Sequence, residues 1–292
     1  MPHPRTVLVT GAAGTIGGFL RTGLPEYGYA LRLLDSAPIP DAPAAITADI
    51  RDTAALQRAM AGVDAVIHLA GISAEAPFED VLGVNIEGTY RLYDAARRAG
   101  VRRIVYASSN HAVGYTPRPA GGSPLSVGVP LRPDTYYGLS KCFGESLASL
   151  YADRHGLETV SIRIGSCFAA PRTVRMLETW LSPADCVRLM HACLTAPGVG
   201  HTVVHGISAN TRGWLDLSGA RALGYDPQDD SEPYAEQLLA QHGELSPDDP
   251  EYRLLGGAFT TCTRWLPTPQ DADASETGTP GTAAPGTGTS EL

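Results

Sequence analysis

Positive charge, long apolar runs and paired cysteines are scarce in this sequence, and each shortage excludes a class of function. The 292 residues have a formal net charge of −9, whereas a nucleic-acid partner needs a basic face. No apolar run is long enough to cross a membrane, and the chain opens on a strand pattern instead of a secretion signal. We therefore expect neither a nucleic-acid partner nor a membrane partner.

The five cysteines have neither CxxC nor Cys/His ligand spacing, and their number is odd. Such cysteines are typical of reduced thiols in a cytoplasm, and they indicate no zinc site. We predict a cytoplasmic protein that holds no metal.

Strand-like and helix-like segments alternate along the first part of the chain. Several strands are continuously apolar, as buried parallel strands are; the predicted strands are Thr6–Thr10, Ala30–Leu34, Ala65–Leu69, Arg103–Ala107 and Thr159–Ile164. Predicted helices fill the intervals at Thr15–Tyr27, Thr53–Ala61, Phe78–Ala99 and Tyr136–His155. This alternation predicts an α/β fold, a Rossmann-like doubly wound parallel sheet that binds its cofactor at the carboxyl ends of the strands.

A glycine-rich loop follows the first predicted strand. Gly11, Gly14 and Gly17 have the spacing GxxGxxG, which differs from the GxGxxG of many dehydrogenases. The first glycine allows a sharp turn, the second a close approach of pyrophosphate, and the third tight packing of helix on strand. A merely tight turn is the alternative, but Asp35 argues against it. We predict that the cofactor contacts Gly11, Gly14, Thr15, Ile16 and Gly17.

Asp35 ends the second predicted strand, at about the distance from the glycines where an adenosine ribose would lie. Its carboxylate would accept hydrogen bonds from the ribose hydroxyls and repel a 2′-phosphate, which favours NAD over NADP. Ser36 follows at the same turn. Further on, Asp49 could receive the adenine amino group while Ile50 packs on the ring. Asp49 could equally cap the next helix, a role for which Asp52 competes.

Tyr137 and Lys141 stand four residues apart and therefore share one helix face. A phenol with a pKa of about 10 is a weak base at neutral pH, but a nearby ammonium and a cationic nicotinamide both favour the phenolate. The pair suits proton transfer coupled to hydride transfer at an alcohol carbon. By itself this spacing is more often that of a surface pair, but its place after a nucleotide-binding loop favours the catalytic interpretation.

Together these elements resemble the extended short-chain dehydrogenase/reductases over roughly residues 5–168. The resemblance rests on TGxxGxxG, Asp35, the His68-Leu69-Ala70-Gly71 strand end, Asn85, a serine after the fifth strand, and YxxxK. It implies that Ser109 orients the alcohol, with Ser108 as the rival for that role. It further implies that Tyr137 is the acid/base and that Lys141 holds the nicotinamide ribose and lowers the pKa of the tyrosine. The other implied NAD contacts are Leu69, Ala70, Gly71, Asn85, Ser108, Ile164 and Cys167.

These elements also divide the chain. We expect an NAD-binding domain with the catalytic residues over residues 1–168 and a small C-terminal substrate-binding lobe over 169–266. The lobe is less regular and richer in Pro and Gly, and it contains a helix capped by Ser182. The last stretch, 267–292, cannot bury apolar surface and predicts a disordered tail.

A narrower resemblance covers nearly the whole chain before the tail. The segments Ala107–His111, Tyr137–Glu145, Arg163–Cys167, Arg175–Leu177 and Gly206–Asn210 are similar to those of the bacterial uronate dehydrogenases. This resemblance implies oxidation of C1 of a hexuronic acid, such as glucuronate or galacturonate, to the aldarolactone with NAD. It implies a small-molecule uronic acid as partner, and the fold makes a homo-oligomer the default.

An acidic substrate requires a cation opposite the hydride acceptor. The resemblance assigns this role to Arg175, whose planar fork matches a carboxylate; without the resemblance, Arg175 would be interpreted as a surface arginine. Ring hydroxyls or the carboxylate would be bound by Ser73, Ser109, Asn110, His111, Tyr137 and Ser166. His111 could instead be a structural histidine.

Two other functions remain open from the sequence. A nucleotide-sugar epimerase or dehydratase would share every cofactor motif, although the lobe after residue 168 is short for a bound nucleotide. A non-catalytic NAD-binding regulator is less compatible with the intact set of Ser109, Tyr137 and Lys141.

Overall fold

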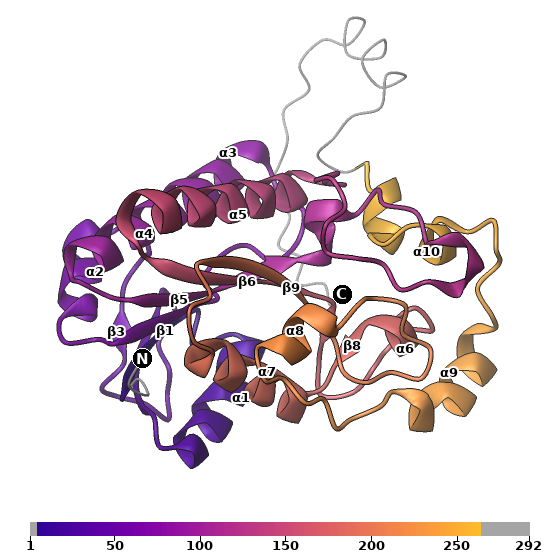
Figure 1. The fold of residues 1–292 in the computed structure, drawn as a ribbon, viewed down its shortest axis with the longest axis horizontal. Helices are drawn as coiled ribbons and strands as arrows, with labels where there is room; N and C mark the ends of the chain where they lie inside the picture. The colour runs from indigo at the N-terminus through magenta and orange to yellow at the C-terminus, as the bar shows by residue number, and fades with distance from the viewer. Residues whose placement is uncertain (1–4, 264–292) are drawn as a thin grey trace, which may run out of the picture.

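The computed structural model describes residues 5–263, so the tail predicted over 267–292 lies outside the described residues. Within this range, parallel strands form one sheet in the order β3-β2-β1-β4-β5-β6-β9 (Figure 1). The strands are β1 Thr6–Thr10, β2 Ala30–Asp35, β3 Ile46–Thr47, β4 Ala65–His68, β5 Arg103–Ser109, β6 Glu158–Ile164 and β9 His201–Gly206. The strand order changes direction between β1 and β4, which confirms the doubly wound sheet.

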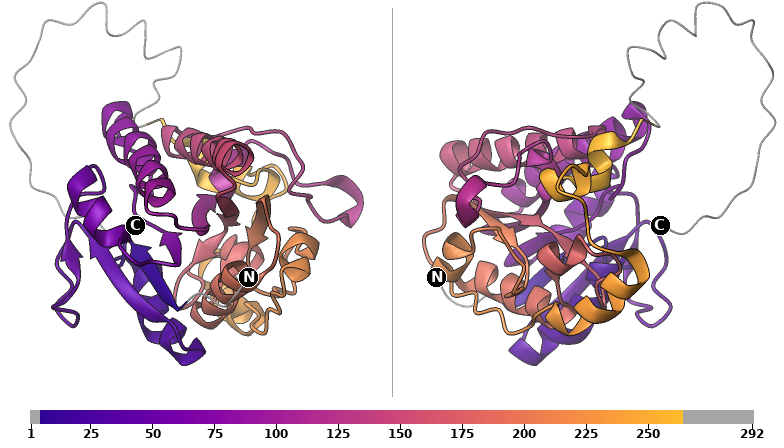
Figure 2. Two further views of the ribbon diagram at one scale, coloured as in Figure 1. Left: turned by 60° about the vertical axis from the view of Figure 1, so that its left-hand side comes forward. Right: turned by 90° about the vertical axis from the view of Figure 1, so that its right-hand side faces the viewer.

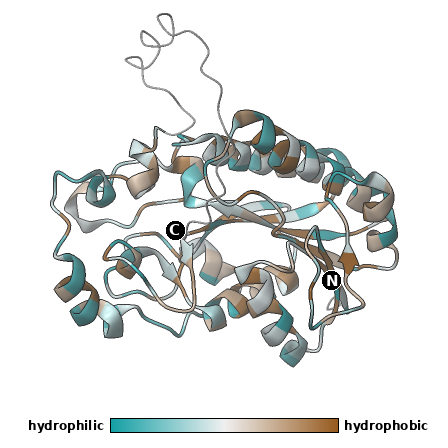
Figure 3. Ribbon diagram, turned by 180° about the vertical axis from the view of Figure 1, so that it is seen from behind, coloured by the Kyte–Doolittle hydropathy of each residue, from teal (hydrophilic) through white to brown (hydrophobic). Residues whose placement is uncertain are grey.

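Helices cover both faces of this sheet, as Figures 1 and 2 show. The layer on one face contains α1 (Thr15–Gly23) and α7 (Pro183–Thr195), and the opposite layer contains α2 (Thr53–Met60), α4 (Gly88–Arg98) and α5 (Tyr136–His155). Each layer closes its own apolar core against the strands. The strands beside the N-terminus are brown in Figure 3, as expected of continuous hydrophobic runs that are buried on both sides. No helix within residues 5–263 is both long and apolar enough to span a membrane.

Helix α5 has the bounds predicted from the sequence. Its N-cap is Thr135, whose hydroxyl accepts from the Gly138 backbone N–H at 3.0 Å, and Gly156 ends it with a φ of +65°. Both are local signals of the kind that fix helix ends. Because α5 carries Tyr137 and Lys141, these caps set where the two predicted catalytic residues lie relative to the sheet.

Two predicted helices differ from expectation. The stretch Phe78–Ala99 consists of α3 (Phe78–Val81), a π-helical segment η2 (Leu82–Glu87) and α4. The stretch Thr15–Tyr27 consists of α1 followed by a 3₁₀ segment, η1 (Leu24–Tyr27). Pro25 lies in η1 and has no N–H to continue an α-helical ladder.

The sequence did not predict β9. This strand pairs in parallel with β6 from Thr159↔His201 to Ile164↔Gly206, and it carries two histidines that obscure its apolar pattern. Together with α7 it completes the sheet, so part of the segment assigned to the lobe builds the core of the nucleotide-binding unit. That residues 169–266 form a separate lobe which binds the substrate stays a prediction.

The remaining elements are short. Strand β7, Ser166–Cys167, lies just before the lobe, and two 3₁₀ turns, η3 Asn110–Val113 and η4 Ala120–Gly122, follow β5. The elements of the lobe are α6 Met176–Thr179, β8 Trp180–Leu181, α8 Ser218–Ala222, η5 Glu232–Tyr234, α9 Ala235–His242, α10 Pro250–Arg253 and η6 Gly257–Thr261. The predicted cap is confirmed, because the Ser182 hydroxyl accepts from the Asp185 backbone N–H at 2.9 Å. The carboxyl end of β5 packs on α5 and, through Asn110, contacts the Leu255 carbonyl of the lobe.

Candidate active site

The glycine loop folds tightly on its neighbours. Gly11 has a φ of +70°, and a Cβ built on it would lie 2.6 Å from the Ala70 backbone nitrogen. A Cβ on Gly17 would lie 2.6 Å from the Gly11 carbonyl oxygen. Both positions therefore require glycine, and the segment Leu69–Gly71 lies directly against the loop, as expected of a shared cofactor surface.

The N-terminus of α1 is open beside this loop. Its N-cap, Gly14, offers no side-chain hydrogen bond, and within residues 5–263 a Cβ there would meet the Gly11 carbonyl oxygen alone, at 3.4 Å. Thr15 is exposed at the same end and Ile16 is partly buried. An uncapped helix N-terminus with free space before it is suited to a phosphate group. These residues fit the pyrophosphate of a dinucleotide.

Asp35 lies at the edge of the same loop. One of its carboxylate oxygens accepts from the Ala13 backbone N–H at 2.9 Å, and the other accepts from the Ala37 N–H at 2.9 Å across the exposed Ser36. The two bonds hold the carboxylate between the glycine loop and the end of β2. Asp35 therefore lies beside the glycine loop, and its contact with the ribose of NAD stays a prediction.

Asp49 does not cap α2; Asp52 does, by accepting from the Ala55 N–H at 3.0 Å. The Asp49 carboxylate instead pairs with Arg51, which donates Nε at 2.9 Å and Nη2 at 2.6 Å. Hydrogen bonding to Arg51 lowers the pKa of Asp49 to about 2. Ile50 is buried. A contact of either residue with adenine stays a prediction.

Asn85 lies in the π-helical segment and joins three parts of the site. Its side chain accepts from the Ile72 N–H at 2.7 Å, donates to the Ile72 carbonyl at 2.9 Å, and donates to the Ser140 hydroxyl on α5 at 3.0 Å. It thereby ties the loop that carries Ser73 to the helix that carries Tyr137. Such π-helical turns are frequent at functional sites.

The two candidate serines at the end of β5 have different surroundings. The Ser108 hydroxyl donates to Glu145 at 2.6 Å, and Glu145 accepts two further bonds from Arg163 at 2.9 Å each. This buried network holds Ser108 in the protein core. Ser109 instead lies close enough to Tyr137 to lower its pKa by hydrogen bonding. The geometry favours Ser109 as the residue that would orient the alcohol.

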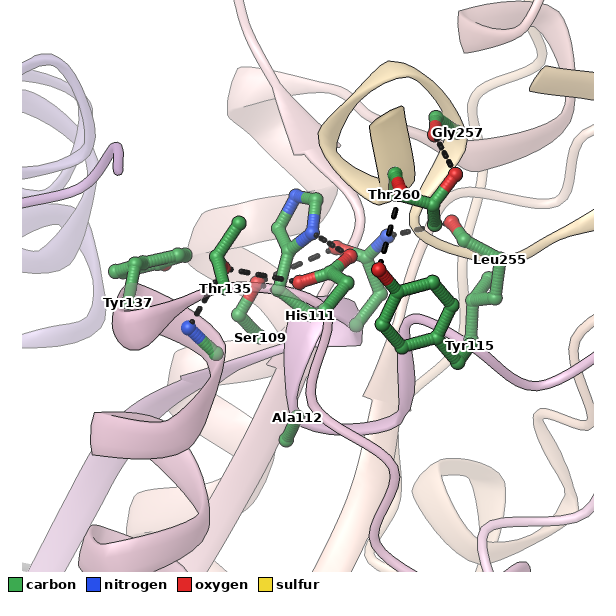
Figure 4. A network of polar contacts seen from close by, with 12 residues as sticks. Ser109, His111, Ala112, Tyr115, Thr135, Tyr137, Leu255, Gly257 and Thr260 are labelled. Atoms are coloured by element: carbon green, nitrogen blue, oxygen red, sulfur yellow. Dashed lines mark hydrogen bonds and ion pairs between the residues drawn. The ribbon is translucent and has the colours of Figure 1, made fainter. Parts of the chain in front are cut away.

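Tyr137 is buried on the same side of the site as Ser109 (Figure 4), and Lys141 is buried one turn further along α5. The Lys141 ammonium donates to the Ala107 carbonyl at 2.8 Å and lies 5.4 Å from the centre of the Tyr137 ring. Burial raises the pKa of Tyr137 to about 12 and lowers the pKa of Lys141 to about 8. Desolvation is the largest cause of the raised Tyr137 pKa, and the hydrogen bond to Ser109 opposes it. The expectation that Lys141 lowers the tyrosine pKa stays a prediction.

The lobe supplies the opposite side of the site. Arg175 is partly buried, and its guanidinium donates to the Leu255 carbonyl. Asn110, at the start of η3, donates to the same carbonyl at 3.0 Å. Burial lowers the pKa of Arg175, while Glu251, Glu178 and Asp134 oppose that shift. The interpretation of Arg175 as a surface arginine is thus wrong.

The other predicted substrate residues lie around this centre. The Ser166 hydroxyl is buried and hydrogen-bonded to the Thr179 hydroxyl at 3.1 Å, whereas Ser73 is exposed. Two predicted cofactor residues, Ile164 and Cys167, are buried at the end of β6 and in β7. Among residues 5–263, no group of three or more His, Cys, Asp or Glu side chains is arranged to hold a metal ion.

Sequence reasoning missed three contributors. The Glu75 carboxylate accepts from the backbone N–H groups of Tyr136 and Tyr137, at 3.1 and 3.0 Å, and so anchors the Ser73 loop to the start of α5. Asp134 accepts from His111, and the C-terminal segment 254–261 brings the Leu255 carbonyl to the site. These contacts join residues far apart in sequence, so neither spacing nor periodicity signals them.

Comparisons with known proteins agree with this geometry. The sequence model of the NAD dependent epimerase/dehydratase family matches residues 7–184. A uronate dehydrogenase of Pseudomonas putida is 49% identical over 259 residues, which cover 87% of this chain and 94% of that protein. The chain belongs to the NAD-dependent epimerase/dehydratase family.

Two solved structures of this family are similar over most of the fold. A glucuronic acid dehydrogenase of Chromohalobacter salexigens is 45% identical with a TM-score of 0.85, covering 91% of this chain and 100% of that chain. A mutant uronate dehydrogenase of Agrobacterium tumefaciens complexed with NAD is 44% identical with a TM-score of 0.82, covering 88% and 97%. The predicted resemblance to the uronate dehydrogenases and the predicted Rossmann-like fold are therefore confirmed.

Proposed function

We propose that this protein oxidises C1 of hexuronic acids, glucuronate or galacturonate, to the aldarolactone with NAD. The observation that carries the proposal is the partly buried Arg175 guanidinium, whose acceptor, the Leu255 carbonyl, also accepts from Asn110 next to Ser109. An alcohol-oxidising triad on one side and a cation on the other match a sugar with a hydroxyl at C1 and a carboxylate at C6. The resemblance to uronate dehydrogenases over 87% of the chain supports the same substrate class.

The protein's residues divide the chemistry between them. Ser109 holds the C1 oxygen, and Tyr137 as phenolate removes its proton; positioning of these groups contributes most of the rate. When bound, NAD supplies the hydride acceptor and a positive charge near the tyrosine. Lys141, fixed by the Ala107 carbonyl, is held near the Tyr137 ring. The product is a lactone, because the sugar ring stays closed when a cyclic hemiacetal is oxidised.

Arg175 can exchange its hydrogen-bond acceptor for a substrate group. Its hydrogen bond to Leu255 goes to a neutral carbonyl, and that carbonyl keeps the amide of Asn110 as a donor. A uronate carboxylate would replace a neutral acceptor with a charged one, which forms the stronger pair with a guanidinium. This exchange favours a carboxylate over a neutral sugar at that end of the site.

Turnover with NAD tests the proposal. The protein should reduce NAD with glucuronate and with galacturonate, measured by NADH absorbance, and should turn over glucose far more slowly. UDP-glucose, the matched probe for an epimerase or dehydratase, should not be consumed. Consumption of the nucleotide sugar without any uronate oxidation would refute the proposal in favour of that alternative. NAD binding without turnover of any sugar would favour a regulator.

Two further expectations stay proposals. All five cysteines are free, and four are buried, which supports a reducing compartment such as the cytoplasm. Tyr90 on α4 and Leu139 and Leu150 on α5 are 50%, 42% and 51% exposed. These apolar side chains support association of copies of this chain into a homo-oligomer, and light scattering on the eluting protein would measure its mass.

A further inference from the structure

The carboxylate of Asp134 is buried at the centre of the candidate site, outside the residues that the proposed function uses. Its side chain is fully buried. One oxygen pairs with Nδ1 of His111 at 2.7 Å, and the other accepts from the Thr135 hydroxyl at 3.0 Å. A buried charge with two hydrogen bonds aimed at it is held in a defined place.

Three glycines from three separate segments make room for this carboxylate. A Cβ on Gly114, after η3, or on Gly256, in the C-terminal segment, would lie 1.9 Å from Asp134 Oδ2. A Cβ on Gly138, in the first turn of α5, would lie 3.0 Å from Oδ1. The backbones of the loop after β5, of helix α5 and of the lobe therefore all pack closely around Asp134. A surface ion pair would need no such packing.

The His111 ring is fixed on its other sides by two aromatic rings. Phe259, on η6, lies with its ring centre 4.1 Å away at 30°, and Tyr137 lies with its ring centre 5.8 Å away at 62°. Figure 4 shows His111 between the side that carries Tyr137 and the side that carries Leu255. With Nδ1 bound to Asp134, Nε2 is the polar atom that the ring has left to offer a ligand.

We propose that Asp134 is a positioning residue that acts through His111: it accepts the proton on Nδ1 in a hydrogen bond, so that Nε2 accepts a hydrogen bond from a ring hydroxyl of the sugar. This inference rests on the proposed function. It assigns the carboxylate of the substrate and one of its ring hydroxyls to different residues of the protein. Arg175 binds the carboxylate as a donor, and His111 binds a hydroxyl as an acceptor. The carboxylate of Asp134 thereby excludes the other neutral tautomer, in which Nε2 would be a donor.

Asp134 also acts on groups other than His111. The charge of Asp134 also opposes the effect of burial on Arg175, so a loss on mutation could arise through the arginine instead of the histidine. In addition to burial, Asp134 raises the pKa of Tyr137 and of Cys142, and Glu178 and Glu251 act on the same arginine as Asp134. The experiment therefore has to show through which side chain Asp134 acts.

A double-mutant cycle makes that distinction. Asp134→Asn keeps the shape that the three glycines enclose, and it should lower kcat/KM for glucuronate about tenfold, the loss expected for a charge-assisted hydrogen bond. In a His111→Ala background the same substitution should change kcat/KM less than about twofold. Equal losses in both backgrounds would overturn the proposal and point to Arg175 or to the fold.

A matched control separates stability from positioning. Asp185 on α7 is also fully buried and accepts hydrogen bonds from the backbone N–H groups of Gln228 and Asp229, at 2.9 and 3.0 Å. Asp185→Asn should lower the melting temperature while leaving kcat/KM for glucuronate within about twofold. An equal loss of kcat/KM in both asparagine variants would show that burial of the charge, not the contact with His111, accounts for the effect.

A measurement on the unmodified protein covers the case in which Asp134→Asn does not fold. Nitrogen-15 spectra of the histidine rings, with His111 assigned by its loss in His111→Ala, should show a protonated Nδ1 and an unprotonated Nε2 at neutral pH. A proton on Nε2 would overturn the proposal. If the wild-type protein oxidises no uronate, the proposed function fails on its own, whereas uronate oxidation with a protonated Nε2 refutes this inference alone.

Discussion

Replacing Arg175 by alanine separates a uronate dehydrogenase from a general C1 dehydrogenase of sugars. The substitution removes the guanidinium and leaves the Leu255 carbonyl with the amide of Asn110 as donor at 3.0 Å, so the segment stays anchored. A charge-assisted hydrogen-bonded pair contributes about 1.5–3 kcal/mol, which corresponds to about one to two orders of magnitude in kcat/KM for glucuronate. Glucose has no carboxylate, so its slow oxidation should change little.

The assay is kcat/KM for glucuronate and for glucose in both proteins. Arg118→Ala serves as a control, because Arg118 also lies in this region and pairs with Glu178, yet its guanidinium packs on Trp214 and Tyr252. The control should affect both sugars equally, through the shape or stability of the lobe. Parallel losses for the two sugars in Arg175→Ala would refute the carboxylate assignment and show that Arg175 supports the fold.

Three other substitutions test the cofactor and proton-transfer assignments. Tyr137→Phe should leave folding and NAD binding intact and lower turnover by about two to four orders of magnitude; near wild-type turnover would remove Tyr137 from the mechanism. Wild-type protein should use NAD far better than NADP, and Asp35→Ala should narrow the gap, as seen in kcat/KM for the two cofactors; equal use by the wild type would place the carboxylate away from the ribose. Because oxidation needs the phenolate and burial raises the pKa of Tyr137 to about 12, activity should rise with pH above neutrality. Ser109 lowers that pKa, so Ser109→Ala should move the rising limb to higher pH, and an unchanged profile would contradict the contact.

The cofactor half of the site could be predicted because each of its signals is complete within a few residues. The sharp turn at Gly11 and the close packing at Gly17 are signalled by the spacing of the glycines after a strand, although Gly11 also packs on Ala70 from another strand end. Tyr137 and Lys141 could be singled out because their helical spacing occurs downstream of a nucleotide-binding loop. Strand β9 was missed because its two histidines interrupt the apolar pattern that identified the other buried strands.

The predicted substrate-binding half of the site depends on contacts between segments that are distant in sequence. Its residues could therefore be predicted only from the resemblance to the uronate dehydrogenases. Arg175 meets the Leu255 carbonyl 80 residues further along, and a single sequence gives no period that joins them. Gly257 illustrates the point: it has a φ of +57°, and a Cβ there would lie 2.4 Å from the Nε of Arg175. In sequence it is one glycine among 32, and its role is visible only when the C-terminal segment lies against the arginine.

In the proposed function a single side chain, Arg175, recognises the anion, so composition would not indicate an acidic substrate. With a net charge of −9, the protein as a whole repels a uronate, although surface charges are screened beyond about 8 Å at physiological salt. The carboxylates that oppose the burial effect on Arg175 include two with partners of their own: Glu178 accepts from the Trp214 ring N–H at 2.8 Å, and Asp134 from His111. An incoming carboxylate therefore competes chiefly with a neutral backbone carbonyl for the guanidinium. Because a charged acceptor binds a guanidinium more strongly than a neutral one, the exchange at this single side chain can select an acid against the overall charge.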